Sequence, residues 1–537
     1  MRPLIVATTA GGQTKPNLTR SMEVWPRSEM TARTYCDSHL TPVSRLWAGR
    51  CARCQYGHRL VVRSLTAMPP QLLGSALAQD NWQTLAMTTE VPMAEEVTPQ
   101  PAHLAIVGGT VLPSDGSDPV VADVIVHDGR VVEIAEPGRP IDAGRTIDAA
   151  GSAVLPGFVD SHTHIASNML LRGFLEDTEL FAWLDTMWRL KQNFDHETLY
   201  WASMCGLVEM AKSGITCFNE HFDAYAVTPQ ARALQDIHLR ATLGYGFADG
   251  GVYADVADWS WAALADFDAA TAGADGIDGD RVRLALSPHA PYSCSEAMWR
   301  EVRALADDRK LPIHTHVAEG LNETAYMQET YGKTTVQWLH DIGFLASDIT
   351  AAHCTQLTAS DITLLAEHDV KVAHCPVCNA KLVSGTMDLR GLMAAGVTVG
   401  LATDGPASHN TLDTFQEMKY AAITHKQATG DPTFLTTREV LDMATRESAK
   451  AMHRPELGTI SVGAPADITI VDMSGAHVAP LYDIEAALVY GSRADDVTHT
   501  IVGGQLVFDA GEVVGVDEEQ VVARFTEHAL ALRDRSI

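Results

Sequence analysis

Histidine and carboxylate residues recur in this sequence directly after short apolar segments. The first of these segments ends in His162 and His164, which are separated by one residue. Alternation along an extended strand places two residues at this spacing on the same face, so both imidazoles can bind one ion. The other polar endings are Ser287-Pro288-His289, His314-Thr315-His316-Val317-Ala318-Glu319, His353-Cys354, His374-Cys375-Pro376 and Thr403-Asp404-Gly405. Groups of these types in this number favour a metal-dependent hydrolase over a coincidental array.

Regular alternation of apolar and amphipathic segments indicates the scaffold that positions these groups. Helical periodicity is expected over Leu199–Ser213, Ala297–Asp308 and Leu412–Thr424. The predicted strands are Ala153–Val159, Ile215–Asn219, Ala241–Gly246, Val282–Leu286, Ile313–Val317, Ile349–His353, Val370–His374 and Val397–Ala402. This alternation predicts an α/β fold, a (β/α)8 TIM-like barrel, whose site lies at the C-terminal ends of the strands. Polar groups end six of the eight predicted strands.

Short alternating strands flank the barrel on both sides. They are predicted at His103–Val107, Val120–His127, Val131–Ile134, Ile468–Val471, Leu488–Tyr490 and His499–Val502. We therefore expect a small β-sandwich domain built from segments before and after the barrel. The predicted organisation is an N-terminal extension over 1–95, the first part of the β-domain over 96–150, the barrel over 151–455, and the second part with a C-terminal helix over 456–537.

The first 90 residues have few periodic segments and contain Cys36, His39, Cys51 and Cys54. This spacing is compatible with a small zinc module. The other interpretation, which we prefer, is an extension without a function in the enzyme, disordered or not part of the native protein.

Composition excludes several classes of function. The formal net charge is −29, with 68 acidic and 39 basic residues, so nucleic acid and membrane surfaces are unsuitable partners. Nine cysteines in 537 residues do not make a disulfide scaffold, and no apolar run approaches the length of a membrane span. We expect a cytoplasmic protein. Its acidity fits either a halophilic organism or a GC-rich genome that favours Arg over Lys.

Several motifs together resemble the amidohydrolase superfamily over about residues 102–505. The segment 155–164, LPGFVDSHTH, is similar to the opening of that family. Further matching segments are Leu171-Arg172-Gly173, His316-Val317-Ala318-Glu319, His374-Cys375-Pro376, Lys381-Leu382, Ala402-Thr403-Asp404-Gly405 and GTISVGAPAD at 458–467. They are similar to the branch that holds methylthioadenosine/S-adenosylhomocysteine deaminases and triazine chlorohydrolases.

The resemblance implies a role for each of the principal site residues. It assigns one metal ion, Zn²⁺ with Fe²⁺ as the alternative, to a set of four ligands, which are His162, His164, His316 and Asp404. Asp404 is then also expected to accept a proton from the attacking water, and His353 to orient that water and stabilise developing charge. Glu319 is expected to protonate a ring nitrogen and to pass a proton to departing ammonia. Binuclear members use a carboxylated lysine, but Lys191, Lys212 and Lys310 do not end predicted strands, which favours one metal per subunit.

The resemblance also implies contacts with the substrate. His289 and Glu319 are expected to meet it, with a structural role as the alternative for His289. Arg172 is a further candidate, although it can instead anchor its loop through an ion pair. The nucleoside deaminases of this branch hold the ribose hydroxyls with a Glu shortly after a Trp-Leu pair. In this sequence no carboxylate stands at the corresponding place after Trp183-Leu184. Gln192 lies nearby and is the remaining candidate for this contact.

We therefore predict a hydrolytic deaminase that acts on a small aminated N-heterocycle (an adenosine-type nucleoside, a purine or a pterin-like ring) and uses water to release ammonia from a non-peptide C–N bond. One alternative is a triazine-type chlorohydrolase or aminohydrolase. An alternative of another class is a non-enzymatic metal-binding protein. We also expect a homo-oligomer.

Overall fold

The computed structural model describes residues 102–536, except 115, 179, 222–226, 275, 276 and 278. The predicted N-terminal extension and the Cys36/His39/Cys51/Cys54 cluster lie outside these residues. Among the residues that are described, no helix is long and apolar enough to cross a membrane.

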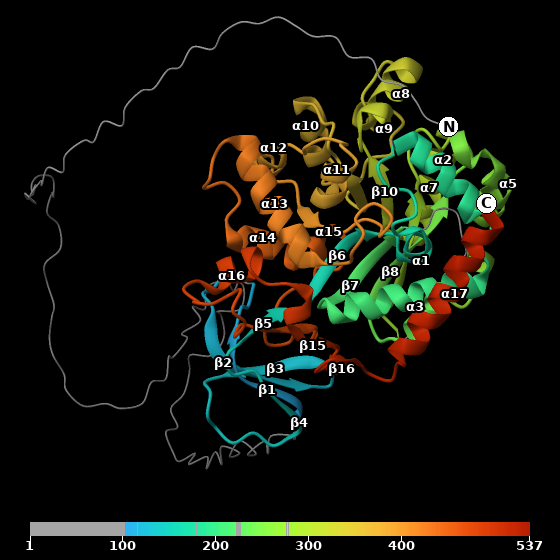
Figure 1. Ribbon diagram of the computed structural model, residues 1–537. Helices are drawn as coiled ribbons and strands as arrows, with labels where there is room; N and C mark the ends of the chain where they lie inside the picture. The colour runs from blue at the N-terminus through green and yellow to red at the C-terminus, as the bar shows by residue number, and fades with distance from the viewer. Residues whose placement is uncertain are drawn as a thin grey trace, which may run out of the picture. The chain divides into compact units, whose positions relative to one another are not determined.

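Eight parallel strands form the central barrel, with helices around it (Figure 1). They follow one another in sequence order and pair with their neighbours from β6 to β13, with irregular register between β6 and β7. A parallel bridge between Thr163 and Asp404 joins the first strand to the segment after the last. The strands are β6 (Phe158–Thr163), β7 (Ile215–His221), β8 (Arg240–Phe247), β9 (Val282–Pro288), β10 (Ile313–Val317), β11 (Ile349–His353), β12 (Lys371–His374) and β13 (Val399–Leu401). The predicted (β/α)8 barrel is confirmed.

Helices connect the barrel strands, and polar N-caps set the beginnings of several of them. The Asp195 carboxylate accepts from Thr198 N before α3, and the Ser295 hydroxyl accepts from Met298 N before α7. The helices up to β11 are α1 (Ile165–Asn168), η1 (Met169–Leu171), α2 (Leu180–Lys191), α3 (His196–Lys212), α4 (Thr228–Asp236), η2 (Gly251–Val256), α5 (Ala257–Ala265), α6 (Phe267–Ala270), α7 (Glu296–Arg309), α8 (Leu321–Tyr331) and α9 (Thr335–Asp341). Those that follow are α10 (Ala359–Glu367), α11 (Pro376–Lys381), α12 (Leu389–Ala394), α13 (Thr414–Thr429), α14 (Thr437–Met443), α15 (Arg446–Ala451), α16 (Ile484–Tyr490), η3 (Ala494–Asp496) and α17 (Glu518–Ser536).

Segments before and after the barrel together form a second sheet of nine strands. The antiparallel pairing of β14 with β5 joins the two flanks of the chain, as the sequence predicted. The sheet has its own apolar core, which includes Ile106, Val124 and Ile468. Its strands are β1 (Ala102–Val111), β2 (Val120–His127), β3 (Arg130–Ala135), β4 (Ala143–Asp148), β5 (Ser152–Pro156), β14 (Ile468–Asp472), β15 (Val497–Val502), β16 (Gln505–Asp509) and β17 (Glu512–Val513).

Gly157 explains one difference from the predicted strands. The predicted strand Ala153–Val159 is two strands, β5 of the second sheet and β6 of the barrel, which meet at Gly157. A Cβ at this position would lie 2.2 Å from Thr216 Oγ1, so only glycine lets the chain pass this close to β7 between the two sheets.

The predicted strand Leu488–Tyr490 is wrong, because this segment lies in helix α16. The Asp483 side chain caps the helix by accepting from Glu485 N and Ala486 N. A strong cap and two alanines in the first turns outweigh the apolar run that suggested a strand.

Candidate active site

Three imidazoles meet at the C-terminal ends of β6 and β10, and each is oriented through its Nδ1 atom. His164 Nδ1 donates to the carbonyl oxygen of His221 at 2.7 Å, and His316 Nδ1 donates to that of His289 at 2.8 Å. His162 Nδ1 shares a hydrogen bond of 2.7 Å with His314 Nε2. A partner on Nδ1 fixes the ring and leaves Nε2 as the atom that faces the centre.

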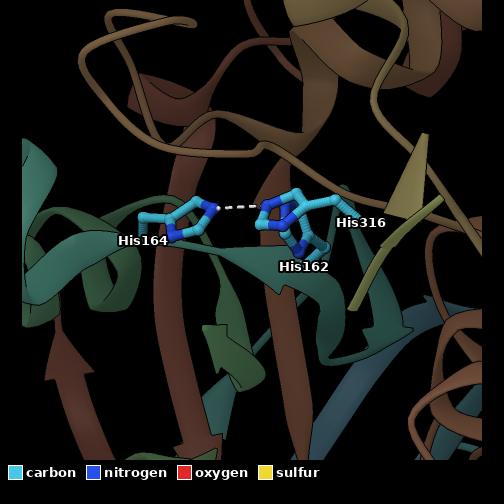
Figure 2. Close-up of side chains that lie close together, drawn as sticks. All are labelled: His162, His164 and His316. Carbon is cyan, nitrogen blue, oxygen red and sulfur yellow. Dashed lines mark hydrogen bonds between the residues drawn. The ribbon is translucent and has the colours of Figure 1, made fainter. Parts of the chain in front are cut away.

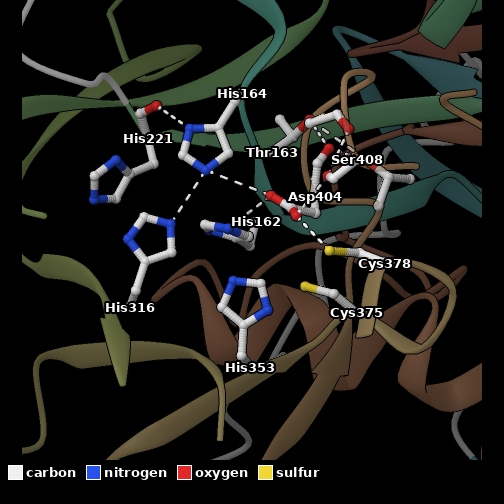
Figure 3. A network of polar contacts seen from close by, with 12 residues as sticks. His162, Thr163, His164, His221, His316, His353, Cys375, Cys378, Asp404 and Ser408 are labelled. Atoms are coloured by element: carbon white, nitrogen blue, oxygen red, sulfur yellow. Dashed lines mark hydrogen bonds and ion pairs between the residues drawn. The ribbon is translucent and has the colours of Figure 1, made fainter. Parts of the chain in front are cut away.

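The three Nε2 atoms converge with a carboxylate oxygen (Figures 2 and 3). His164 Nε2 lies 3.2 Å from His316 Nε2. Asp404 Oδ1 lies 3.3 Å from His162 Nε2 and 3.5 Å from His164 Nε2. All four side chains are buried. The four ligand atoms that the sequence suggested are therefore brought together within one small volume.

A divalent cation fits this donor set. Since His164 and His316 both use their Nδ1 protons on backbone carbonyls, their neutral rings turn two lone pairs toward each other at 3.2 Å. Burial lowers the pKa of His316 well below its usual value, so protonation of the His316 ring does not relieve this contact at neutral pH, and burial also lowers the pKa of His162 to about 3. His162 Nε2 is buried without a hydrogen-bond partner. A metal ion between these atoms satisfies all of them.

The backbone around the site adopts left-handed conformations at several strand ends. Ala318, His353 and Asp404 have φ values of 50°, 72° and 58°. Non-glycine residues rarely adopt this region, and such strain concentrates where a side chain must be aimed into a site.

Asp404 has separate partners for its two carboxylate oxygens. Oδ1 faces the imidazoles, whereas Oδ2 accepts from the Ser408 hydroxyl and from the Cys378 thiol, each at 2.7 Å. Burial opposes ionisation, but the adjacent imidazoles outweigh it and hold the pKa of Asp404 well below its usual value. Asp404 is therefore an oriented carboxylate at neutral pH.

Glu319 is a buried carboxyl group in the same pocket, just after β10. Burial raises the pKa of Glu319 to about 7, so a proton can be gained or lost there near neutral pH. Its backbone N–H donates to Glu323 Oε2 at 2.9 Å, and its carbonyl oxygen accepts from the Thr355 hydroxyl at 2.6 Å. The main chain of Glu319 is thus held from both sides.

Two further imidazoles border the centre. His353 Nδ1 lies 3.0 Å from Asn379 Oδ1, which leaves Nε2 available to the site. His289 Nδ1 donates to the Ser293 hydroxyl at 2.8 Å, and its ring lies 4.6 Å from that of Tyr253. This arrangement provides a polar side at His353 and an aromatic side at His289.

A pocket opens onto these groups at the C-terminal end of the barrel. Its lining residues are His164, Asn168, Trp183, Leu184, Lys191, Tyr253, His289, Tyr292, His316, Glu319, His353, Leu382, Asp404 and Ser408. Aromatic rings and a few converging polar groups suit a flat polar heterocycle. Asn168 Oδ1 is buried in this lining without a hydrogen-bond partner, so it can accept a hydrogen bond from a ligand.

Two residues suggested as substrate contacts are not among the lining residues. Arg172 forms an ion pair with Glu209 and contacts Met169 Sδ at 3.1 Å. Gln192 donates to Asp255, which also accepts from Trp188 Nε1. Lys191, one position earlier at the end of helix α2, lines the pocket together with Trp183 and Leu184 of the same helix.

Sequence reasoning missed the residues that support the site from behind. No motif marks them, and several lie far along the chain from the groups they hold. They are Glu220, His221, Glu323, Cys378, Asn379 and Ser408. Only the second carboxylate after His316, at Glu323, offers a signal, because it follows Glu319 by one helical turn.

A (β/α)8 barrel with three imidazoles and a carboxylate converging at its strand ends defines a metal-dependent hydrolase. The sequence model of the amidohydrolase family matches residues 153–507, more than half of the chain. The chain belongs to the amidohydrolase family, as the motifs suggested.

Two characterised relatives match most of the chain. A 5'-deoxyadenosine deaminase of Methanosarcina acetivorans is 37% identical over 409 residues, which cover 76% of this chain and 93% of the relative. A 5-methylthioadenosine/S-adenosylhomocysteine deaminase of Pelotomaculum thermopropionicum is 36% identical over 441 residues, which cover 81% of this chain and all of the relative.

Solved structures share the fold. A zinc-bound adenosine deaminase from Xanthomonas campestris has a TM-score of 0.76 and 31% identity, covering 82% of this chain and 99% of the other. An atrazine chlorohydrolase from Arthrobacter aurescens, also with zinc, has a TM-score of 0.72 and 24% identity, covering 79% of this chain and all of the other. The likeness to the chlorohydrolase concerns the fold alone.

Proposed function

We propose that this enzyme is a hydrolytic deaminase that releases ammonia from an aminated N-heterocycle, with an adenosine-type nucleoside as the first candidate substrate. The single observation that carries the proposal is the placement of Glu319, a proton donor with a pKa of about 7, in the same pocket as the four converging ligand atoms. The names of the relatives, deaminases of 5'-deoxyadenosine and of 5-methylthioadenosine/S-adenosylhomocysteine, support the same reaction and substrate class.

The ligands we propose are His162, His164, His316 and Asp404, and the ion is Zn²⁺, with Fe²⁺ as the alternative. Three nitrogen donors and one oxygen donor suit zinc and leave a position for water, and the ion supplies Lewis acidity that lowers the pKa of that water. A single ion per subunit is supported because a second candidate group, with His353 and Cys375, shares the His162 ligand.

Three side chains move protons or orient the reactants in this proposal. Asp404 accepts a proton from the attacking water, since its carboxylate is ionised and held in place by Ser408 and Cys378. His353, oriented by Asn379, hydrogen-bonds to the water and stabilises negative charge that develops at the attacked carbon. Glu319 protonates the adjacent ring nitrogen, regains a proton that originates from the attacking water, and gives it to the departing amine, which leaves as ammonia; the other water proton, accepted by Asp404, restores protonated Glu319.

Substrate recognition follows from the pocket lining. Stacking beside His289 and Tyr253 and a hydrogen bond to Asn168 Oδ1 suit a flat ring that carries N–H groups. Cytoplasmic location, a homo-oligomeric state and the domain boundaries remain predictions of the sequence.

Ammonia release by the purified protein tests the proposal, with metal analysis on the same sample. The panel contains adenosine, 5'-deoxyadenosine, 5-methylthioadenosine, S-adenosylhomocysteine, guanine, a pterin and atrazine. We expect ammonia in equal amount to the heterocycle consumed, from at least one adenosine derivative. Chloride release from atrazine alone would favour the chlorohydrolase alternative, and a metal-loaded protein without any turnover would contradict the proposal.

A further inference from the structure

Two buried thiols, of Cys375 and Cys378, lie beside the proposed metal centre, and the proposed function uses only that of Cys378. Cys375 and Cys378 follow β12, at the N-cap and within helix α11. Cys378 donates to Asp404 Oδ2 at 2.7 Å. Cys375 Sγ lies 4.0 Å from the carbonyl oxygen of Ala373, a weak contact that leaves the sulfur able to turn to another partner.

Cys375 forms a second group of potential metal ligands with His162 and His353. One donor atom from each of these residues lies within 4.8 Å of the others, and all three side chains are buried. Figure 3 shows the sulfur of Cys375 on the side of the site where His353 and Asp404 lie. A thiolate and two imidazoles are a donor set that binds soft divalent ions strongly.

The second group overlaps the first in one atom. His162 Nδ1 is occupied by His314, so Nε2 is the nitrogen that either group can use. This same Nε2 lies 3.3 Å from Asp404 Oδ1. The two groups therefore describe two neighbouring positions for one ion rather than two sites that fill together.

The negative charges around Cys375 Sγ favour a bound cation and disfavour a free thiolate. Burial and the nearby carboxylates, Asp404 first among them, raise the pKa of the Cys375 thiol well above its usual value. The thiol consequently stays protonated until an ion replaces its proton. Binding at this position forms one metal–sulfur bond, breaks one S–H bond and releases one proton to solvent.

We propose that His162, His353 and Cys375 form an alternative position for a thiophilic divalent ion, displaced from the position that the proposed reaction uses. An ion at this position engages His353 and removes it from the attacking water. Soft ions such as Cd²⁺ therefore inhibit the enzyme while remaining bound at its centre. The assignment of ligands stands on geometry and does not depend on the reaction being a deamination.

Cadmium is the probe that tests this proposal, because a cadmium–thiolate bond has a charge-transfer band in the ultraviolet. The full-length protein is freed of metal with a chelator and reloaded with one equivalent of Cd²⁺, with bound metal measured on the same sample. We expect a band equivalent to one thiolate per cadmium. In Cys375→Ser the band falls to the baseline while one equivalent of Cd²⁺ stays bound, and in the matched control Cys378→Ser the band persists.

The proposal is overturned by bound cadmium without a band in the wild-type protein, by a band that survives in Cys375→Ser, or by one lost only in Cys378→Ser. Cadmium-113 NMR of the wild-type protein distinguishes thiolate from purely nitrogen and oxygen coordination, so a shift without thiolate character overturns the proposal even if a variant does not fold. His127→Ala controls for adventitious ions, since His103, His127 and Asp128 form an exposed cluster elsewhere. A failure of ammonia release would contradict the deaminase function but leave the band unchanged.

Discussion

The carboxylate of Glu323 accepts a hydrogen bond from the backbone N–H of Glu319 at 2.9 Å, four residues earlier in the chain. Its other oxygen accepts from Ala318 N at 2.9 Å, and the Thr335 hydroxyl donates to it as well. Ala318 has a φ of 50°, so the chain turns sharply between the proposed ligand His316 and Glu319. Glu323 stabilises this turn and thereby aims the Glu319 side chain into the pocket.

Replacing Glu323 by Gln should impair catalysis without removing the metal. The amide keeps one acceptor but turns an N–H₂ group toward a backbone N–H, and an unmade buried hydrogen bond costs about 1–3 kcal/mol. We expect kcat to fall roughly tenfold or more, because part of this free energy holds the turn that aims Glu319 into the pocket. Steady-state kinetics with metal analysis tests this; Glu329→Gln, an exposed position in the same helix α8, is the matched control and should behave as wild type.

Glu319→Gln should retain the metal and lose most of the rate. Glutamine fills the same space but cannot exchange a proton, and general acid–base catalysis typically contributes about 10²–10⁴-fold. Metal content, melting temperature and kcat are measured together. Normal turnover by this variant would show that Glu319 is not the proton donor.

The activity should depend on pH through Glu319. Burial raises its pKa to about 7, and the proposed reaction begins with its protonated form. Activity is therefore full below this value and is lost as pH rises through about 7. The pH profile of kcat/KM should show this alkaline limb in the wild-type enzyme, whereas the residual activity of Glu319→Gln should lack it. The same limb in both proteins would assign it to another group.

His162→Ala and Asp404→Asn should each lose metal and turnover together. Each removes one of the four converging ligand atoms, and the remaining three are a weaker set for a divalent ion. Metal content per chain and ammonia release are the two readouts. His340→Ala, an exposed histidine outside the site, controls for the loss of an imidazole; full activity in His162→Ala would contradict the ligand assignment.

Removing the metal should lower thermal stability. Without a cation, His164 Nε2 and His316 Nε2 oppose their lone pairs at 3.2 Å in the protein interior. A ligand present at about a thousand times its Kd stabilises the native state by roughly 4 kcal/mol. A chelator should lower the melting temperature of the wild-type protein, and added Zn²⁺ should restore it. His162→Ala should melt at the same temperature with and without the chelator.

The barrel was predictable because each of its strands depends on local sequence. β10 and β11 were predicted with their observed bounds, Ile313–Val317 and Ile349–His353, since both are apolar runs bounded by polar residues. Strand alternation places His162 and His164 on one face, whereas the full set of four proposed ligands came from the family resemblance.

The rest of the site depends on contacts between distant segments. Asn379 orients His353, and Cys378 hydrogen-bonds to Asp404, each across 26 positions of the chain and without any local signal for either pair. Gln192 directly follows helix α2 and hydrogen-bonds to Asp255, whereas Lys191, the last residue of that helix, lines the pocket.

The bridge between Thr163 and Asp404 has a consequence for how the protein is made. It joins residues separated by 241 positions, and the metal ligands lie on both sides of it. The chain must therefore pass through nearly the whole of the barrel before the site exists, and a nascent polypeptide without β13 has no complete set of ligands. The complete set of proposed ligands can therefore form only after β13 has been synthesised and the barrel has closed.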